Sequence, residues 1–244
     1  MRRLSVAGEV RYVIARKSED LQTINELLRS VYINERGWLP PDYSNILEDK
    51  YHPHSSYILA INKETGIGCM RIVSDSAVGL PIEQFFPLAP LKETQRFVES
   101  QRMMVLPEYR NAIMNGAPYG MWAGLVKACI QYCFVNKISH VFADLFTDPS
   151  TGPMVRKFRA LGFQQIGVPF HDTELGARGQ SVAMLLTVSQ FLSRAYASRD
   201  ALFNYLLEFD TAFEFYPEAR PASRDPEPAL AECAEKLVTR KFGS

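Results

Sequence analysis

The segment from Trp122 to Phe146 reads WAGLVKACIQYCFVNKISHVFADLF and contains a helical pattern followed by a strand pattern. Apolar residues recur in its first half at positions i, i+3, i+4, i+7, i+8, i+11 and i+12, which predicts a helix with one apolar face. The second half, Ser139 to Phe146, is typical of a short strand. A helix that runs directly into a strand is typical of proteins in which helices pack on a sheet.

The same alternation continues in both directions along the chain. Further strands are expected at Arg11–Arg16, Tyr57–Asn62, Ile67–Val73, Gln95–Leu106, Phe163–Phe170 and Ser181–Leu186. Helical spacing predicts one helix over residues 18–36 and another that is opened by Asp148 and Pro149 and ends at Gly162. We predict an α/β (α+β) fold with a mixed central sheet and helices on both faces. Residues 1–186 are expected to form one domain, and residues 187–244 a helical C-terminal extension packed on it.

Composition narrows the class of protein. Apolar residues make up 47% of the 244 residues and charged residues 22%, which is typical of a globular protein. Lysine plus arginine balances aspartate plus glutamate at 27 each, so neither a nucleic acid nor a membrane surface is an expected partner. No uncharged apolar run approaches the ~20 residues of a membrane span. The four cysteines are scattered without paired spacing, so we expect no metal site and a cytoplasmic location.

Several short runs carry more specific information. Leu28 to Trp38 reads LRSVYINERGW, and the loop after it ends in Glu48-Asp49-Lys50-Tyr51-His52. The other runs are Arg71 on the third strand, Leu80 to Phe86 (LPIEQFF), Glu99-Ser100-Gln101-Arg102 on the fourth strand, and Gly152 to Pro169 with FRALG and IGVP inside it.

These runs resemble, in this order, acyl-homoserine-lactone (autoinducer) synthases and the related long-chain N-acyl amino acid synthases. The resemblance covers roughly residues 12 to 186 and implies a GNAT-like acyl-CoA N-acyltransferase fold. It also implies a fatty-acyl donor on acyl carrier protein and an amino-acid-like acceptor, with no permanently bound cofactor. The donor substrate is then acyl-ACP or acyl-CoA.

Two departures from the families bear on the alternatives. His52 stands where autoinducer synthases have a second aspartate, which disfavours S-adenosylmethionine as acceptor. The stretch Asn115 to Gly120 (NGAPYG) differs from the usual coenzyme A pyrophosphate loop, which disfavours a coenzyme A-dependent N-acetyltransferase. We therefore expect N-acylation of an amino acid or similar small amine. An autoinducer synthase, an N-acetyltransferase and a non-catalytic acyl-binding module remain the alternatives.

Glu99 and Arg102 are the candidate catalytic residues. Attack of an amine on a thioester needs a base for the amine proton, and a glutamate beside a sheet cleft can supply it. Side chains alternate along a strand, so residues 99 and 102 share one site only if a bulge lies between them. Alternatively, each side chain pairs with another charge and stabilises the fold.

Other residues are assigned to substrate binding. Arg29, Arg36 and Arg71 are expected to orient the acceptor carboxylate or to brace the loop through Asp49 or Glu99, or else to form buried ion pairs. Tyr32 and Trp38 either line the acceptor pocket or belong to the core. Met103, Met104 and Val105 could line an acyl channel or, by default, pack in the core.

A set of cations is assigned to docking of the acidic carrier protein. Arg156, Lys157 and Arg159 fall on the predicted helix that ends at Gly162, and Arg110 and Lys127 lie near the expected cleft. A basic rim would guide an acidic carrier protein. The alternative is an ordinary solvated helix face.

Overall fold

The computed structural model describes residues 5–43, 47–147, 152–172, 179–209 and 213–214. The strands are β1 (Ser5–Ile14), β2 (Ser55–Asn62), β3 (Thr65–Ser74), β4 (Phe97–Val105), β5 (Ile113–Asn115), β6 (His140–Phe146), β7 (Gln164–Phe170), β8 (Ser181–Thr187) and β9 (Phe213–Glu214). The α-helices are α1 (Ser18–Arg29), α2 (Ala89–Lys92), α3 (Met121–Val135), α4 (Gly152–Leu161), α5 (Val188–Ala197) and α6 (Ala201–Leu207). Shorter turns of helix are η1 (Ser30–Glu35), η2 (His52–His54), η3 (Pro81–Gln84) and η4 (Pro107–Tyr109).

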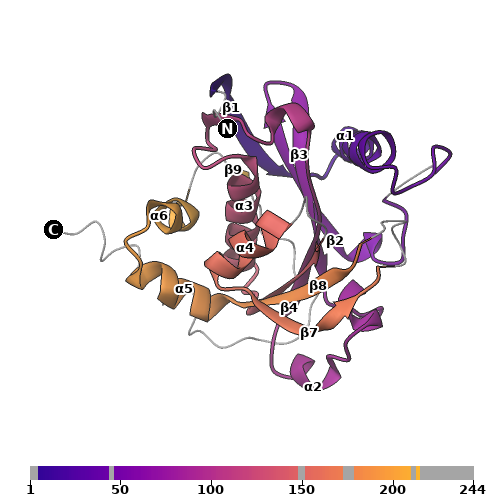
Figure 1. Cartoon of the computed structure of the whole chain (residues 1–244), viewed down its shortest axis with the longest axis vertical. Coiled ribbons are helices and arrows are strands. Elements are labelled where there is room, and N and C mark those ends of the chain that lie inside the picture. The colour runs from indigo at the N-terminus through magenta and orange to yellow at the C-terminus, as the bar shows by residue number, and fades with distance from the viewer. Residues whose placement is uncertain (1–4, 44–46, 148–151, 173–178, 210–212, 215–244) are drawn as a thin grey trace.

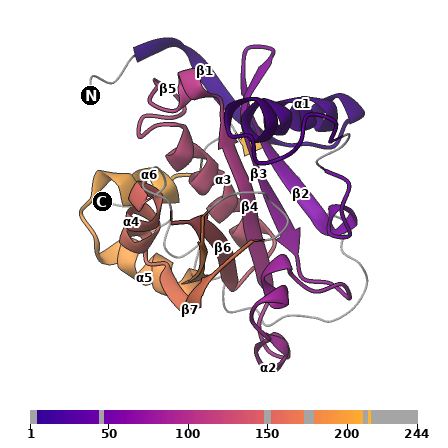
Figure 2. The same ribbon diagram turned by 45° about the vertical axis from the view of Figure 1, so that its right-hand side comes forward.

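The described strands form one mixed sheet. Their order is β5-β1-β2-β3-β4-β6-β8-β7, with β9 beside β1. The pairs β1/β5, β1/β9 and β4/β6 are parallel, and the remaining pairs are antiparallel. The strand β4 therefore lies in the interior of the sheet, between β3 and β6 (Figure 2).

Helices cover both faces of this sheet. The cross-strand pair Ile58 and Met70 belongs to the core on the α3 side, whereas the adjacent pair Leu59 and Cys69 belongs to the core on the α1 side. Because side chains alternate along each strand, a run of buried apolar residues supplies both layers. Figure 1 shows α1 on one side of the sheet and α3 to α6 on the other. The predicted mixed sheet with helices on both faces is confirmed.

Some boundaries differ from the sequence-based expectation. The helix predicted over residues 18–36 begins as α1 and continues as one π-helical stretch, η1, with Gly37 at φ +61° after it. The first strand begins at Ser5 rather than Arg11. The short strand β5 was not predicted, because three residues carry no periodicity that could reveal it. The expected helix start at Asp148 and Pro149 lies outside the described residues.

The C-terminal segment packs on the α3 side. Phe191 of α5 and Leu206 of α6 are buried in the same cluster as α3. The strand β9 runs parallel to β1, and the ring of Phe213 stacks on that of Tyr12, with centroids 5.0 Å apart. None of the helices in the described ranges combines the length and apolarity needed to cross a bilayer. A domain boundary at residue 186 stays a prediction.

Candidate active site

Glu99 lies in the middle of β4, and its side chain is almost fully buried, with 1% exposed. Its Oε2 accepts a hydrogen bond of 2.7 Å from the backbone N–H of Ile82. Its Oε1 accepts one of 2.9 Å from Nε2 of Gln101. A carboxylate is costly to bury without such donors, and Ile82 and Gln101 hold it in position.

A small pocket opens beside Glu99 between β4, β6, η3 and the end of β7. Its lining residues are Pro81, Ile82, Gln84, Phe85, Glu99, Gln101, Asp144, Phe170 and Asp172. The rings of Phe85 and Phe170 stack with centroids 4.1 Å apart and form an aromatic wall. Glu99 is therefore shielded from bulk water but is not sealed inside the core.

The strands β4 and β6 part directly after Ser100, one residue beyond Glu99. Their parallel pairing runs from Phe97–His140 to Ser100–Ala143 and goes no further. Beyond that point β6 continues along β8, while β4 continues along β3. Within the described residues, the edge of β4 that faces β6 after Ser100 has no strand paired to it. The sheet is thus open next to the buried carboxylate.

A bulge in β4 lies at the start of this opening. Between the cross-strand pairs Arg71–Gln101 and Cys69–Met104, β4 has one residue more than β3. Arg102 lies in this bulge and has φ +50°, in the left-handed region. On a regular strand Arg102 would face away from Glu99, but a bulge re-aims the side chain. The bulge needed for Glu99 and Arg102 to face one site is present.

Asp49 connects the bulge to β3. Nη1 and Nη2 of Arg71 each donate to one oxygen of Asp49 at 2.6 Å, and Nη2 of Arg102 donates to Oδ2 at 3.0 Å. Arg71 is 1% exposed, and its Nε donates to the hydroxyl of Ser55 at 2.8 Å. Burial alone would raise the pKa of Asp49, but the hydrogen bonds and charge of Arg71, with the charge of Arg102, hold it below its ordinary value. The bidentate contact between Arg71 and Asp49 is present and agrees both with bracing of the loop and with a buried ion pair, while an acceptor-binding role for either residue stays a prediction.

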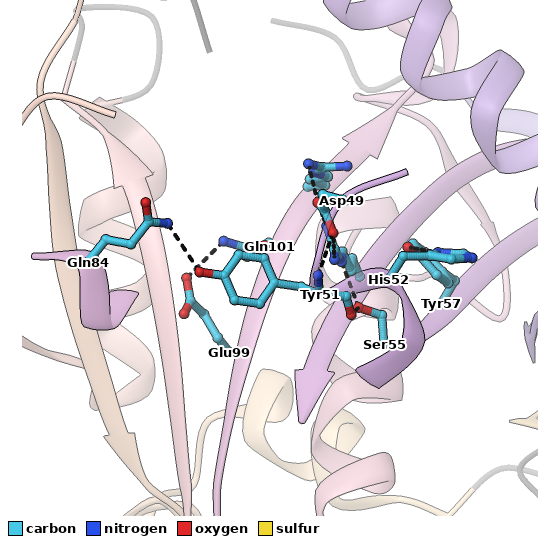
Figure 3. A network of polar contacts seen from close by, with 10 residues as sticks. Asp49, Tyr51, His52, Ser55, Tyr57, Gln84, Glu99 and Gln101 are labelled. Carbon is cyan, nitrogen blue, oxygen red and sulfur yellow. Dashed lines mark hydrogen bonds and ion pairs between the residues drawn. The ribbon is translucent and has the colours of Figure 1, made fainter. Parts of the chain in front are cut away.

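Tyr51 lies between Asp49 and Glu99, and no role is predicted for it from the sequence. Its side chain is 1% exposed, and its hydroxyl accepts a hydrogen bond of 3.2 Å from Nε2 of Gln84. Figure 3 shows the ring of Tyr51 pointing from the Asp49 side towards Glu99 and Gln101. The run Glu48 to His52 could have indicated Tyr51, because the tyrosine comes two residues after Asp49. From the sequence, a role in the site is assigned to Asp49 alone.

Tyr32 and Trp38 form an aromatic connection from the helix η1 to the end of β6. The ring centroid of Trp38 lies 5.4 Å from that of Tyr32 and 4.8 Å from that of Phe146. Tyr32 is buried, and burial raises its pKa far above the ordinary value. The side chain of Trp38 is partly exposed. The pair therefore lies beside the opened end of β6, but neither residue lines the pocket around Glu99.

Arg29 and Arg36 contact neighbouring backbone and side chains rather than the pocket. Arg29 donates to the backbone carbonyls of Tyr43 and Pro41. Arg36 forms an ion pair of 3.2 Å with Glu35 and lies 5.6 Å from the ring centroid of Trp38. Arg29 thus contacts the loop through its backbone carbonyls and not through Asp49 or Glu99 as predicted. An acceptor-binding role for either arginine stays a prediction.

The three apolar residues assigned to an acyl channel do not face one side. Met104 packs in the cluster under α1, whereas Met103 and Val105 pack against the cluster that contains α3. Alternation along β4 explains this division. A single channel cannot therefore be lined by all three side chains on one face of the sheet.

A second pocket lies at the N-terminus of α3. It is lined by Arg110, Asn111, Ala112, Ile113, Tyr119, Gly120, Trp122 and Lys157. Nζ of Lys157 lies 4.5 Å from the ring centroid of Trp122. Arg110 donates to Glu35 at 2.7 Å and to the carbonyl of Val105 at 3.0 Å. Two of the five predicted carrier-docking cations thus flank a helix N-terminus, which favours anions.

The other predicted docking residues divide into two groups. Arg156 and Arg159 are exposed on α4, and Arg159 donates to Gln165 at 2.8 Å. Lys127 does not lie on the surface: it is 1% exposed, and its Nζ is 4.3 Å from the ring centroid of Tyr205. The prediction for Lys127 was wrong, because α6 covers this part of α3. Among the described residues, no group of three His, Cys, Asp or Glu side chains is arranged to hold a metal ion.

Comparison with known proteins places the chain in a family. The sequence profile of the N-acyl amino acid synthase FeeM matches residues 23–186. The solved structure of FeeM, an N-acyl amino acid synthase from uncultured soil microbes, has 20% identity and a TM-score of 0.60, over 76% of this chain and 94% of FeeM. BjaI, a coenzyme A-dependent acyl-homoserine lactone synthase solved with SAM and isopentyl-CoA, has 16% identity and a TM-score of 0.59, over 93% of this chain and 99% of BjaI. No curated protein matches the sequence.

An acetyltransferase of the GNAT family from Desulfovibrio desulfuricans shares the fold more distantly. It has 13% identity and a TM-score of 0.50, over 73% of this chain and 99% of its own. The likeness to these structures shows the GNAT fold. The profile match covers most of the chain, and the chain belongs to the FeeM family of N-acyl amino acid synthases. It is an N-acyltransferase.

Proposed function

We propose that this enzyme transfers a fatty-acyl group from the thioester of acyl carrier protein to the amine of an amino acid or similar small acceptor. The observation that carries the proposal is the position of Glu99, a buried carboxylate that lines a pocket where β4 and β6 part. The FeeM profile supports the acceptor class.

Glu99 is the base in this proposal. Its carboxylate is held by hydrogen bonds from the Ile82 N–H and from Gln101, and it lines the pocket in which an incoming amine would donate to it. Removal of the ammonium proton gives the neutral amine, which attacks the thioester carbonyl. The carbon–nitrogen bond forms and the carbon–sulfur bond breaks. The second proton that the attacking nitrogen loses passes to the leaving sulfur, so the carrier leaves as a thiol.

Besides a base, the reaction needs donors that stabilise the carbonyl oxygen of the thioester, and the opened edge of β4 supplies them in this proposal. Backbone N–H groups beyond Ser100 on the β6 side are the donors we assign to it, because the strand pairing ends there. The Arg102 bulge and its tie to Asp49 hold this part of β4 in shape. Arg102 then acts by positioning and need not touch the acyl group.

The donor's phosphopantetheine phosphate is assigned to the pocket at the N-terminus of α3. Gly120, the N-cap of α3, lines it together with Arg110 and Lys157, so a helix dipole and two cations favour an anion. Arg156 and Arg159 on the same helix as Lys157 extend the basic surface towards an acidic carrier. Acyl-CoA carries the same phosphopantetheine group and is the alternative donor. We place the reaction in the cytoplasm, which the scattered cysteines support.

A substrate panel tests the proposal. Purified protein is incubated with acyl carrier protein or coenzyme A charged with several fatty acids and with each common amino acid, and products are identified by mass spectrometry. We expect an N-acyl amino acid and faster turnover with the carrier than with coenzyme A. One set of reactions contains S-adenosylmethionine as the acceptor. Release of methylthioadenosine in that set would identify an autoinducer synthase instead. Absence of any amide product across the panel would contradict the proposal.

A further inference from the structure

The C-terminal helices contact the loop that forms the phosphate pocket. Tyr205 of α6 is 7% exposed, and its hydroxyl donates a hydrogen bond of 2.8 Å to the backbone carbonyl of Gly116. Its ring centroid lies 5.3 Å from that of Tyr119, which lines the pocket. A residue 89 positions later in the chain thus touches both ends of a short loop.

This loop has a backbone conformation that requires glycine at two positions. Gly116 has φ +84° and Gly120 has φ +89°, both in the left-handed region. The loop also packs tightly, since a Cβ on Gly116 would lie 2.5 Å from the carbonyl oxygen of Val10. Within the loop the N–H of Gly120 donates to the carbonyl of Ala117 at 3.0 Å, so the loop conformation sets where the first turn of α3 begins, and with it the pocket.

Tyr205 is itself held firmly by α3. Nζ of Lys127 lies 4.3 Å from the Tyr205 ring centroid, within cation–π range. Nε2 of Gln131 donates to the backbone carbonyl of Glu208 at 2.8 Å, just after α6 ends. At the other end of α6, the side chain of Asp200 accepts from the N–H of Leu202 at 2.9 Å. The tyrosine hydroxyl is therefore fixed from the same helix whose N-terminus it helps to place.

We propose that Tyr205 is a positioning residue for donor binding: its hydroxyl holds the Gly116–Gly120 loop so that the N-terminus of α3, Arg110 and Lys157 together bind the donor phosphate. The inference rests on the proposed function, because it assumes a phosphopantetheine donor. It gives the C-terminal extension a part in the reaction, beyond adding to the core.

The test is Tyr205→Phe, which keeps the ring and removes only the hydrogen bond. Binding of decanoyl carrier protein and of decanoyl-coenzyme A is measured by calorimetry without acceptor, and amide hydrogen exchange is followed in the same variant. Loss of one buried hydrogen bond to the loop is expected to raise the dissociation constant of the donor about three- to tenfold. Exchange should become faster at residues 116–120 and stay unchanged in α1. In turnover assays the KM for the donor should rise while kcat and the KM for the acceptor stay within about twofold.

Tyr196→Phe is the matched control, because Tyr196 is an exposed tyrosine on the neighbouring helix α5. It should leave both readouts unchanged. Unchanged donor binding in Tyr205→Phe, exchange that rises throughout the protein, or a wild-type protein that binds neither thioester would overturn the inference. Wild-type protein that binds donor but forms no amide, together with weaker binding by Tyr205→Phe, would overturn the proposed function alone.

Discussion

At the scale of single residues, Asp49 is the connection between the strands of the site. It accepts hydrogen bonds from Arg71, which is buried, and from Arg102 in the bulge. Its own side chain is 22% exposed, so the pair with Arg71 lies at the border between core and solvent. Removing the carboxylate would leave a buried guanidinium without its main partner, which is more costly than losing a surface ion pair.

Asp49→Asn should lower the free energy of unfolding by about 2–3 kcal/mol, and activity should fall as well, because the bulge loses its tie to β3. Denaturant titration followed by fluorescence measures the first effect. Asp75→Asn, which breaks a more exposed pair with Lys92, is the control and should cost no more than about 1 kcal/mol. An equal loss of unfolding free energy in the two variants would show that the buried pair stabilises the protein no more than the exposed pair.

The same carboxylate predicts a pH dependence. The pKa of Asp49 is lowered in the folded protein, chiefly by Arg71 acting against burial. Its contribution to stability is therefore fully present above the unfolded pKa of about 4 and is lost as pH falls through the lower folded value. The difference in unfolding free energy between wild type and Asp49→Asn should stay constant from about pH 8 to pH 5 and shrink below about pH 4. A difference that grows on acidification would contradict this sign.

At the scale of elements, α3 packs closely against β1. Gly124 faces the hydroxyl of Tyr12, and an ideal Cβ on Gly124 would lie 1.7 Å from that oxygen. The Tyr12 ring has little room to move, because Phe213 stacks on it at 5.0 Å. Glycine is therefore needed in a helix interior, where alanine would otherwise be favoured.

Gly124→Ala should lower the free energy of unfolding by about 1–3 kcal/mol, as overpacking in a core does, in spite of the better helix propensity of alanine. Thermal unfolding monitored by circular dichroism provides the measurement. Gly152→Ala at the start of α4 is the control, since its nearest neighbour is the end of the Arg156 side chain at 4.0 Å. A Gly124→Ala protein more stable than wild type would show that α3 and β1 are not in close contact here.

At the scale of the whole molecule, the layers of the fold could be predicted from the sequence, because periodicity records which faces are buried. The helical spacing in α3 and the alternation of strands with helices indicated the mixed sheet. The expectation that α3 buries one apolar face was wrong, because every residue from Ala123 to Cys133 is buried. The sequence could not predict the bulge at Arg102 directly. It showed only that a bulge is required if Glu99 and Arg102 share a site. Periodicity does not reveal strand partners, so the parting of β4 from β6 came from the structure alone.

Contacts between distant segments account for what the sequence could not show. Lys127 lies within an apolar helix, and only the position of α6 reveals that it is covered rather than exposed. Tyr51 and Gln84 come from separate loops, and their meeting near Glu99 depends on how both loops cross the sheet. In each case a polar side chain contacts a residue far away in the sequence, and no spacing pattern in the sequence predicts such a contact.

The central claim is that Glu99 removes the proton of the acceptor amine. Single-turnover acyl transfer is measured for wild type, Glu99→Gln and the exposed control Glu93→Gln across pH, with donor binding and thermal unfolding checked for each. We expect Glu99→Gln to bind donor as wild type does and to lose about 100-fold or more in rate, while Glu93→Gln keeps the wild-type rate. A Glu99→Gln rate equal to wild type at every pH would contradict the claim.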